Sequence, residues 1–285
     1  MTSIEQYAQF ARAHLPEPFA TKWIGLLRPA VQFPAATGPG ETTALRLGGH
    51  PDLPEELEWP TFEGYGPLSF IAELDCTAVA AAGGVELLPE SGHLLFFCVD
   101  ERYDGPDKNV DYEWQLTAWT CGRVIYVPEG APSRPRQEPR YLEPYATGLR
   151  PARAVGTPPN MNWQLAEHYF GSEAKALANP LHPLWTEEFV SGITGMRETY
   201  AQCGGHSRPC QGPPEMEAAT AAIDAGRSPH LHVLDEAAHW RVLLQIPEPD
   251  DLGMIWGDCP VAYWMIHDDD LKTRNFDRVW FTMQS

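Results

Sequence analysis

Short runs of β-branched and aromatic residues, separated by glycine and proline clusters, constrain this chain more than any other feature of its sequence. Such runs are typical of strands, and the clusters between them are typical of turns. The runs are LSFIAEL (68–74), HLLFFCV (93–99), QLTAW (115–119), RVIYV (123–127), WRVLLQI (240–246), VAYWMI (261–266) and RVWFTM (278–283). Because HLLFFCV is continuously apolar, we expect that strand to be covered on both faces. The pattern predicts an α+β fold that is mainly β.

Helical signals lie outside these runs. Ser3 and Gln6 form a capping box at the start of an N-terminal helix, which Pro16 ends. Further along, Thr186 is suited to begin a helix, and Gly226 is suited to follow the end of another. The sequence therefore predicts helices before and between the strand-rich parts.

The order of these signals predicts one domain over residues 1–285. Residues 128–160 are rich in proline and arginine, which is typical of a long connection rather than of a second core. The expected parts are an N-terminal helix at 1–20, a first β-rich half at about 40–130, this connection with helices at about 131–226, and a second β-rich half at about 239–285.

A weak internal repeat links the two β-rich halves. Gly48-Gly49-His50 recurs as Gly204-Gly205-His206, and each is followed by three apolar runs in the same order. A duplicated unit whose two halves form one core would produce this order. Coincidence is the alternative, because paired glycines and apolar strands are common.

The charge of the chain limits its partners. The sequence has 39 acidic and 20 basic side chains and a formal net charge of −19 at pH 7. Such a surface repels phosphate backbones and anionic lipids, which argues against nucleic acids and membranes. It favours a basic protein partner. The alternative is that charge of this size only keeps the protein soluble. No run approaches the ~18 apolar residues of a membrane span, and MTSIEQYAQF is not a secretory signal. We therefore expect a cytoplasmic protein.

Two of the six cysteines raise the question of a metal site. Cys203, His206 and Cys210 lie close together in sequence, and thiolates and imidazole are the ligands that zinc prefers. The spacing matches no standard zinc motif, so a glycine-turned loop with two reduced thiols is the alternative. We expect no cofactor, with zinc as the alternative.

Glycine, histidine and acid also meet in the segment GGHPD. Glycines let backbone approach a ligand closely, and His50 with Asp52 could exchange a proton. A tight turn uses the same residue types, and it is the favoured interpretation.

Further candidates are aromatic or polar residues in apolar surroundings. Trp59 in LEWP, and Trp256 and Asp258 in WGDC, suit either a pocket wall or a turn with a packed ring. Glu73 and Gln245 lie within apolar runs, at equivalent points of the repeat. If both face inward they line a shared cleft, and if both face outward they are ordinary strand polarity.

The motifs together resemble those of the YwqG-like family of bacterial proteins. The resemblance rests on LRLGGHPDLPEELEWPTFEGYGPLSFIAELD, on LLPESGHLLFFCVDE and on the closing segment from WRVLLQI to the C-terminus, and covers roughly residues 44–101 and 200–285. It implies a domain of unknown function with a mainly β fold, and an immunity role for some members. The chain departs from the family pattern at His206, where relatives tend to have an aromatic residue, and in its proline-rich middle.

Three functions follow from these observations. The first is a binding module, of the immunity type or an adaptor, for a basic partner. The second is a small-molecule binder or enzyme with a cleft between the two halves, lined by a group of candidates: His50, Asp52, Glu73, His206, Trp256 and Asp258. The third is a zinc protein. The sequence has no GxSxG, HExxH or dinucleotide-binding motif.

Overall fold

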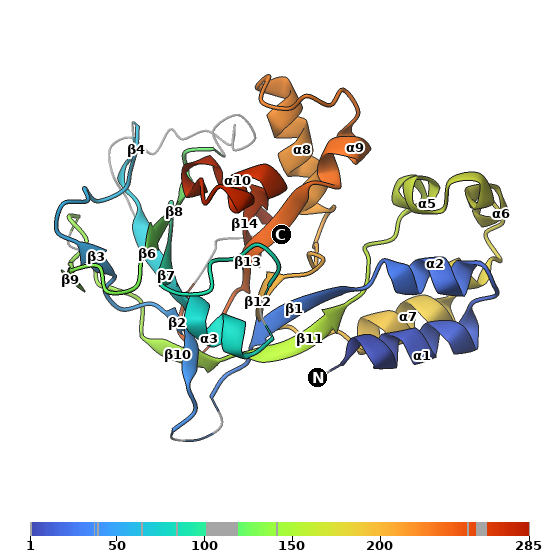
Figure 1. Ribbon diagram of the computed structural model, residues 1–285, viewed down its shortest axis with the longest axis horizontal. Coiled ribbons are helices and arrows are strands. Elements are labelled where there is room, and N and C mark those ends of the chain that lie inside the picture. The colour runs from blue at the N-terminus through green and yellow to red at the C-terminus, as the bar shows by residue number, and fades with distance from the viewer. Residues whose placement is uncertain are drawn as a thin grey trace.

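The computed structural model describes most of the chain. The described residues are 2–36, 38, 40–63, 65–83, 85–100, 119–140, 142–249, 251–254 and 261–284. Figure 1 shows two packed sheets with most of the helices gathered at one end of the molecule.

The larger sheet has six antiparallel strands, most of them from the C-terminal half of the chain. In spatial order these are β11 (Arg153–Thr157), β1 (Arg28–Phe33), β12 (Ala201–Gly204), β13 (Trp240–Pro247), β14 (Val261–His267) and β15 (Trp280–Gln284). Because β1 and β11 come from outside the second half, this sheet joins distant parts of the sequence.

The smaller sheet has five antiparallel strands, most of them from the first half. In spatial order these are β10 (Gly148–Pro151), β2 (Thr43–Leu47), β6 (Ser69–Asp75), β7 (His93–Cys98) and β8 (Gly122–Val127). Two short ribbons accompany it: β3 (Asp52–Pro54) with β9 (Ser133–Pro135), and β4 (Thr61–Phe62) with β5 (Gly66–Pro67).

The two sheets contain the same four-strand meander. The order β2-β6-β7-β8 in one sheet matches β12-β13-β14-β15 in the other. The first strand of each meander ends at the paired glycines, and Gly48, Gly49, Gly204 and Gly205 all have φ between 65° and 74°. Both turns thus adopt the left-handed backbone that glycine allows.

The second strand of each meander carries an irregularity at the same place. The register shifts between Phe70 and Ala72 on β6, and between Val242 and Leu244 on β13. A bulge inserts one unpaired residue and increases the local twist. The polar residues Glu73 and Gln245 follow directly after Ala72 and Leu244, where the regular pairing resumes.

One hydrophobic cluster fills the space between the sheets. It contains buried residues of both, among them Leu45, Phe96, Trp264 and Phe281. The continuously apolar strand β7 is buried from Leu94 to Cys98, which agrees with the expectation that both its faces are covered.

Five helices form a layer with a separate hydrophobic cluster, at the right of Figure 1. They are α1 (Ile4–His14), α2 (Phe19–Gly25), α5 (Trp163–Phe170), α6 (Ala174–Leu177) and α7 (Glu187–Gly195), with the short 3-10 turns η1 (Gly171–Glu173) and η2 (Pro183–Trp185). We call this group the helical layer. Its cluster is built on Tyr7, Trp23, Phe170 and Phe189.

The remaining helices lie against the sheets. Those near the six-stranded sheet are α8 (Pro214–Asp224), α9 (Val233–Ala237) and α10 (Asp268–Lys272), and α3 (Cys76–Ala81) follows β6. A 3-10 turn, η3 (Phe276–Arg278), leads into β15. Among the described residues, no helix combines the length and apolar character that a bilayer crossing requires.

The predicted α+β class, mainly β, is confirmed. The capping box is also present: Ser3 Oγ accepts from the Gln6 amide, and the Gln6 side chain accepts from the Ser3 amide. Thr186 caps α7, and Gly226 follows α8 with φ 64°.

The expectation for residues 128–160 needs correction. The segment 128–160 supplies strands β9, β10 and β11 in addition to connecting the halves. Its prolines are compatible with this because short edge strands tolerate missing donors. The run QLTAW lies outside the described residues except for Trp119.

Candidate functional site

Cavities gather where the helical layer meets the six-stranded sheet. One of them has a volume of about 300 Å³, and we call it the junction cavity. Its principal lining residues are Trp23, Asn160, Asn162, Trp185, Phe189 and Arg197. A smaller cavity of about 20 Å³, which is room for one water, shares Arg197 with it and reaches His206 and Gln202.

Packing within the helical layer positions the aromatic wall of the junction cavity. Trp23 on α2 and Phe189 on α7 meet edge to face, with ring centroids 5.5 Å apart. Trp185 Nε1 donates to the carbonyl of Leu177 at 2.8 Å. Because this indole N–H is bonded inside the layer, the ring is fixed at the cavity.

Polar residues enter the same cavity from the chain that leads into α5. Asn162 Oδ1 accepts from the Leu165 amide at 2.8 Å and begins that helix. Asn160 Nδ2 donates to Ser207 Oγ at 2.9 Å, which connects this chain to the loop after β12. Both asparagines therefore have structural bonds as well as a place on the wall.

Arg197 is the charged group of the junction cavity. Its Nη2 donates to the carbonyls of Pro158 and Pro159, at 3.1 and 3.5 Å. Its Nε is buried and has no hydrogen-bond partner among the described residues. Burial lowers the pKa of Arg197, while Tyr7 and Glu215 oppose that shift. Glu215 is bonded to the amide and hydroxyl of Ser207, and among the described residues it forms no ion pair with Arg197.

A second residue of this lining also has an unpaired donor. Trp23 Nε1 is buried without a hydrogen bond in the part of the chain that the structure describes. Buried polar groups are nearly always bonded to protein or to water, so each of the two donors needs an acceptor. A water molecule or a ligand could supply it.

His206 connects the helical layer to the second glycine turn. The side chain is buried, and its Nε2 lies 2.6 Å from the Leu26 carbonyl, at the end of α2. Burial lowers its pKa to about 3, with Arg28 acting in the same direction. The imidazole is therefore neutral at pH 7, and Nε2 donates its proton to Leu26. This bond gives the buried imidazole a hydrogen-bond partner.

Gln245 and Glu73 lie in different sheets and do not share a cleft. Gln245 is buried and its Oε1 accepts from the Arg208 amide at 3.0 Å. Glu73 is paired with Arg46, and its Oε1 lies 3.1 Å from His93 Nδ1. Each polar side chain is thus satisfied on its own sheet, and apolar side chains fill the space between the sheets.

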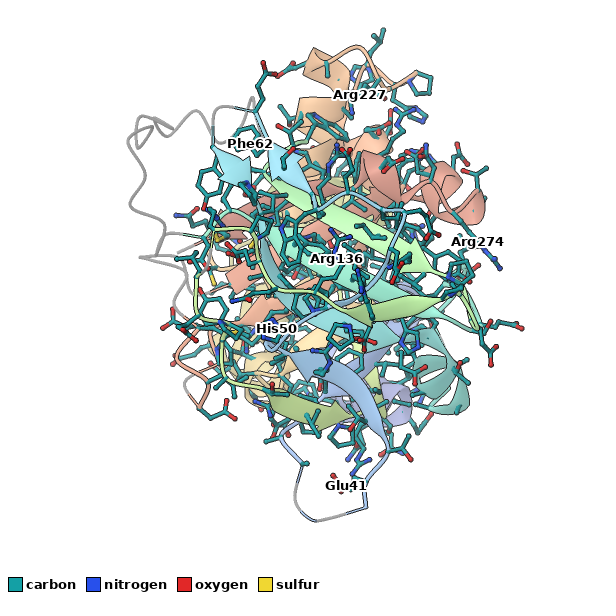
Figure 2. The ribbon with its side chains drawn as sticks, turned by 90° about the vertical axis from the view of Figure 1, so that its left-hand side faces the viewer. Glu41, His50, Phe62, Arg136, Arg227 and Arg274 are labelled. Carbon is teal, nitrogen blue, oxygen red and sulfur yellow. The ribbon has the colours of Figure 1, made fainter. Side chains whose placement is uncertain are left out.

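The remaining candidates near the first glycine turn do not approach the junction cavity. His50 is exposed on the face that Figure 2 presents, away from the helical layer. Asp52 is half-buried in β3, and buried Trp59 donates from Nε1 to the Leu68 carbonyl at 2.7 Å. Trp256 and Asp258 lie outside the described residues.

Close packing accounts for the paired glycines. A Cβ at Gly48 would lie 2.4 Å from the Ala146 carbonyl oxygen, and one at Gly204 would lie 2.6 Å from Val85 Cγ1. The turn interpretation of GGHPD therefore has a structural basis, since no side chain fits there.

The cysteine–histidine motif is spread over different environments. Cys203 is fully buried in the core, Cys210 is exposed, and His206 is bonded to Leu26. Among the described residues, no group of three or more histidine, cysteine or acidic side chains is arranged to hold a metal ion.

Comparison with known families identifies the chain. A family model described as a domain of unknown function, DUF1963, matches residues 45–285. The chain belongs to the DUF1963 family. No curated protein matches the sequence. The DUF1963 region includes Trp185 and Arg197, whereas Trp23 precedes it. One wall residue of the junction cavity therefore comes from α2, which lies before the matched region.

Proposed function

We propose that this DUF1963 chain binds a small molecule whose anionic group pairs with Arg197 in the junction cavity. The observation that carries the proposal is the buried Nε of Arg197, which has no partner among the described residues and lines a cavity of about 300 Å³. The ligand would lie against Trp23, Trp185 and Phe189. Mostly apolar walls with a few placed polar groups are typical of small-molecule sites.

The local charge of Arg197 supports an anionic ligand. Burying a guanidinium away from water is unfavourable unless an acceptor compensates for the lost hydration. Arginine presents several donors in a planar fork, which matches a carboxylate or a phosphate. Since the net charge is −19, an anion gains little from the surface as a whole. Specific recognition must therefore come from local donors.

The donors favour recognition over acid–base chemistry. Guanidinium, indole and amide N–H groups donate hydrogen bonds but do not exchange protons near neutral pH. The neutral His206 is already bonded to Leu26. We therefore propose binding as the primary activity, and an enzymatic role is the alternative.

Calorimetric titration with a matched pair of probes tests the proposal. The probes are 2-naphthoate, which is flat and anionic, and its neutral analogue 2-naphthamide. We expect the carboxylate to bind at least tenfold more tightly, because a charge-assisted bond contributes roughly 1.5–3 kcal/mol. Arg197→Gln should abolish this preference. Arg12→Gln, which changes an exposed arginine paired with Glu5, is the control.

The outcome that contradicts the proposal is equally specific. If both probes bind equally, or if Arg197→Gln keeps the preference while remaining folded by circular dichroism, Arg197 is not the anion site.

The charge favours a second function. We also propose that the chain is a YwqG-like bacterial protein of the cytoplasm that binds a basic protein partner, as an immunity protein would. The net charge of −19 supports this, because an acidic surface accelerates association with a basic partner. Pull-down at low salt, followed by kinetics with the purified partner, tests it. An association rate that falls steeply with ionic strength is expected, and a rate insensitive to salt contradicts it.

A further inference from the structure

A second cavity, of about 290 Å³, lies beside the second glycine turn and the start of α10. We call it the α10 cavity. Residues from β1, from the segment after α3, from β13 and from α10 line it, among them Arg28, Val85, Leu88, Val242, Asp268 and Leu271. None of these six lines the junction cavity. Arg28 also lines a separate cavity of about 40 Å³ near His206.

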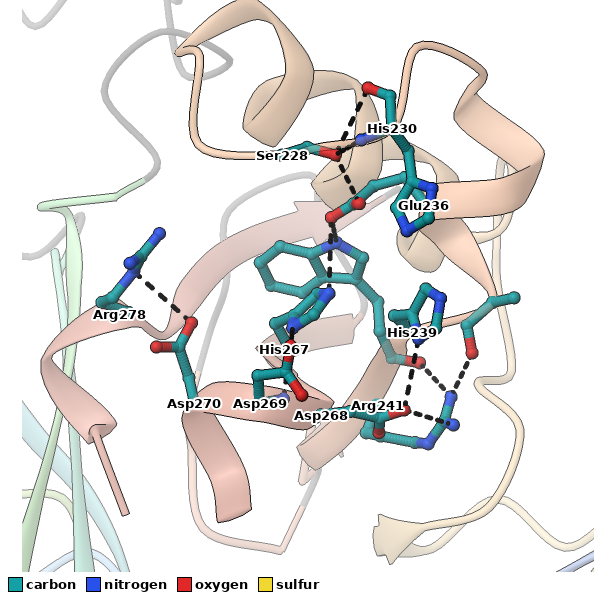
Figure 3. Close-up of polar contacts among 12 residues, drawn as sticks. Ser228, His230, Glu236, His239, Arg241, His267, Asp268, Asp269, Asp270 and Arg278 are labelled. Atoms are coloured by element: carbon teal, nitrogen blue, oxygen red, sulfur yellow. Dashed lines mark hydrogen bonds and ion pairs between the residues drawn. The ribbon is translucent and has the colours of Figure 1, made fainter. Parts of the chain in front are cut away.

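Asp268 supplies an unpaired acceptor to the α10 cavity. Asp268 is 9% exposed, and its Oδ1 is buried without a hydrogen-bond partner among the described residues. The other oxygen, Oδ2, accepts from Arg241 Nη2 at 2.8 Å and lies 3.7 Å from His239 Nδ1. Figure 3 shows both side chains directed at Asp268. One oxygen is therefore fixed by protein contacts, and the other is left for a ligand donor.

Arg28 supplies an unpaired cation to the same cavity. Its backbone carbonyl accepts from Thr157 Oγ1 at 2.9 Å, which fixes the start of β1. Its guanidinium has no ion pair or hydrogen bond in the described part of the chain. The cavity has two other cations, and both are paired: Arg241 Nη2 is 2.8 Å from Asp268 Oδ2, and Lys272 Nζ is 3.1 Å from Asp269 Oδ1. Arg28 therefore remains available for an anion.

The rest of the wall is mostly apolar. Val85, Leu88, Val242 and Leu271 contribute aliphatic side chains, and Leu88 and Leu271 are buried. Glu86 lines the cavity from an exposed position. A ligand that fits this cavity therefore needs a cationic hydrogen-bond donor, an anionic group and an aliphatic side chain.

From these three features we propose that the α10 cavity binds a free α-amino acid with an aliphatic side chain. The ammonium group donates to Asp268 Oδ1, the carboxylate pairs with Arg28, and the side chain packs against the aliphatic wall. A zwitterion matches both charges without burying a net charge, so each polar group regains a partner lost on desolvation. The site is separate from the junction cavity, and it stands whether or not Arg197 binds an anion.

Titration with L-leucine and two analogues tests the proposal. Isoamylamine lacks the carboxylate of leucine, and 4-methylpentanoate lacks its ammonium group. We expect leucine to bind at least tenfold more tightly than either analogue, because each loses one charge-assisted bond. If leucine does not bind, or binds no better than the analogues, the proposal is wrong.

Two variants with matched controls locate the site. Asp268→Asn should weaken leucine at least tenfold and leave 4-methylpentanoate unchanged, whereas Asp224→Asn, at an exposed position outside the cavity lining, should change neither. Arg28→Gln should weaken leucine and leave isoamylamine unchanged. Because Asp268 also holds Arg241, Arg28→Gln is the decisive variant if Asp268→Asn fails to fold. Unchanged leucine binding in folded Arg28→Gln overturns the proposal.

Discussion

Phe96 on β7 and Trp264 on β14 occupy equivalent positions in the two sheets, and their rings meet across the core. Phe96 pairs with Ala72 on β6, and Trp264 pairs with Leu244 on β13. Ala72 and Leu244 are the first paired residues after the bulge of their strand. The ring centroids are 5.5 Å apart at an interplanar angle of 75°. Trp264 Nε1 also donates to the Phe97 carbonyl at 3.3 Å. Equivalent residues in direct contact are what a duplicated unit packed about a pseudo-twofold axis produces.

The first prediction concerns this contact. Phe96→Ala and Trp264→Ala should each lower the free energy of unfolding by about 3–5 kcal/mol, because both rings are fully buried. The double variant should lose less than the sum, since the two rings contact each other. Urea unfolding measures all three. Leu149→Ala, at a 48% exposed position, is the control and should change stability by less than about 0.5 kcal/mol. Strict additivity would contradict the contact.

The second prediction concerns the glycine turns. Gly204→Ala should destabilise the protein by about 2 kcal/mol or more, because a left-handed backbone costs a non-glycine residue about 1–2 kcal/mol and the new Cβ clashes with Val85. Gly212→Ala is the matched control, since nothing lies within 4 Å of its Cβ position. Thermal unfolding compares the two. Equal midpoints for both variants would show that the turn is not constrained.

The third prediction is a pH dependence from Glu73 and His93. Burial raises the pKa of Glu73, but His93 and Arg46 outweigh it and the net shift is downward. The hydrogen bond to Glu73 raises the pKa of His93. Glu73 therefore stabilises the fold above its ordinary value of 4.5, and this is lost as pH falls through its lowered pKa. His93 stabilises below its ordinary value of 6.5, and this is lost as pH rises through its raised pKa.

The measurement is the melting-temperature difference between wild type and His93→Gln. It should be largest between the ordinary values of 4.5 and 6.5 and should shrink at alkaline pH. His50→Gln, at an exposed position, should show no such trend. A difference that grows with alkaline pH would rule out the ion pair as its source.

The strand-rich organisation could be predicted because it depends on local signals. The runs at 93–99, 240–246 and 261–266 correspond to β7, β13 and β14, and Thr186 caps α7 as its position indicated. The strands β1 and β12 carry no comparable signal, because RPAVQF and AQCG contain few β-branched or aromatic residues and gain their pairing from distant partners. Tertiary context decides such strands.

Most of the candidate site could not be predicted from the sequence. Arg197 is in the segment TGMRETY, where nothing marks it as buried or unpaired. Its importance arises only when residues 158–162, α2 and α7 meet around it. The sequence indicates His206 as a ligand-binding or metal-binding candidate, whereas in the structure its ring is bonded to the Leu26 carbonyl. Convergence of side chains from distant segments has no periodicity that a single sequence displays.

The fourth prediction concerns the thiols and tests the zinc alternative. Cys210 is exposed, whereas Cys76, Cys98, Cys121 and Cys203 are buried. Burial raises the pKa of Cys76 and Cys121 to about 12, so their reactive thiolate forms are scarce at neutral pH. Maleimide labelling of the native protein with peptide mapping should modify Cys210 ahead of these four. Protection of Cys210 that a chelator removes would instead support a bound metal.

The account depends most on an anion beside Arg197. Diffraction from crystals soaked in 6-bromo-2-naphthoate tests this directly, because the bromine gives an anomalous signal. The account predicts a bromine peak in the cavity between Trp23 and Trp185, with the carboxylate at hydrogen-bond distance from Arg197. An occupied site elsewhere with an empty junction cavity, or a bound probe whose carboxylate faces away from Arg197, would contradict it.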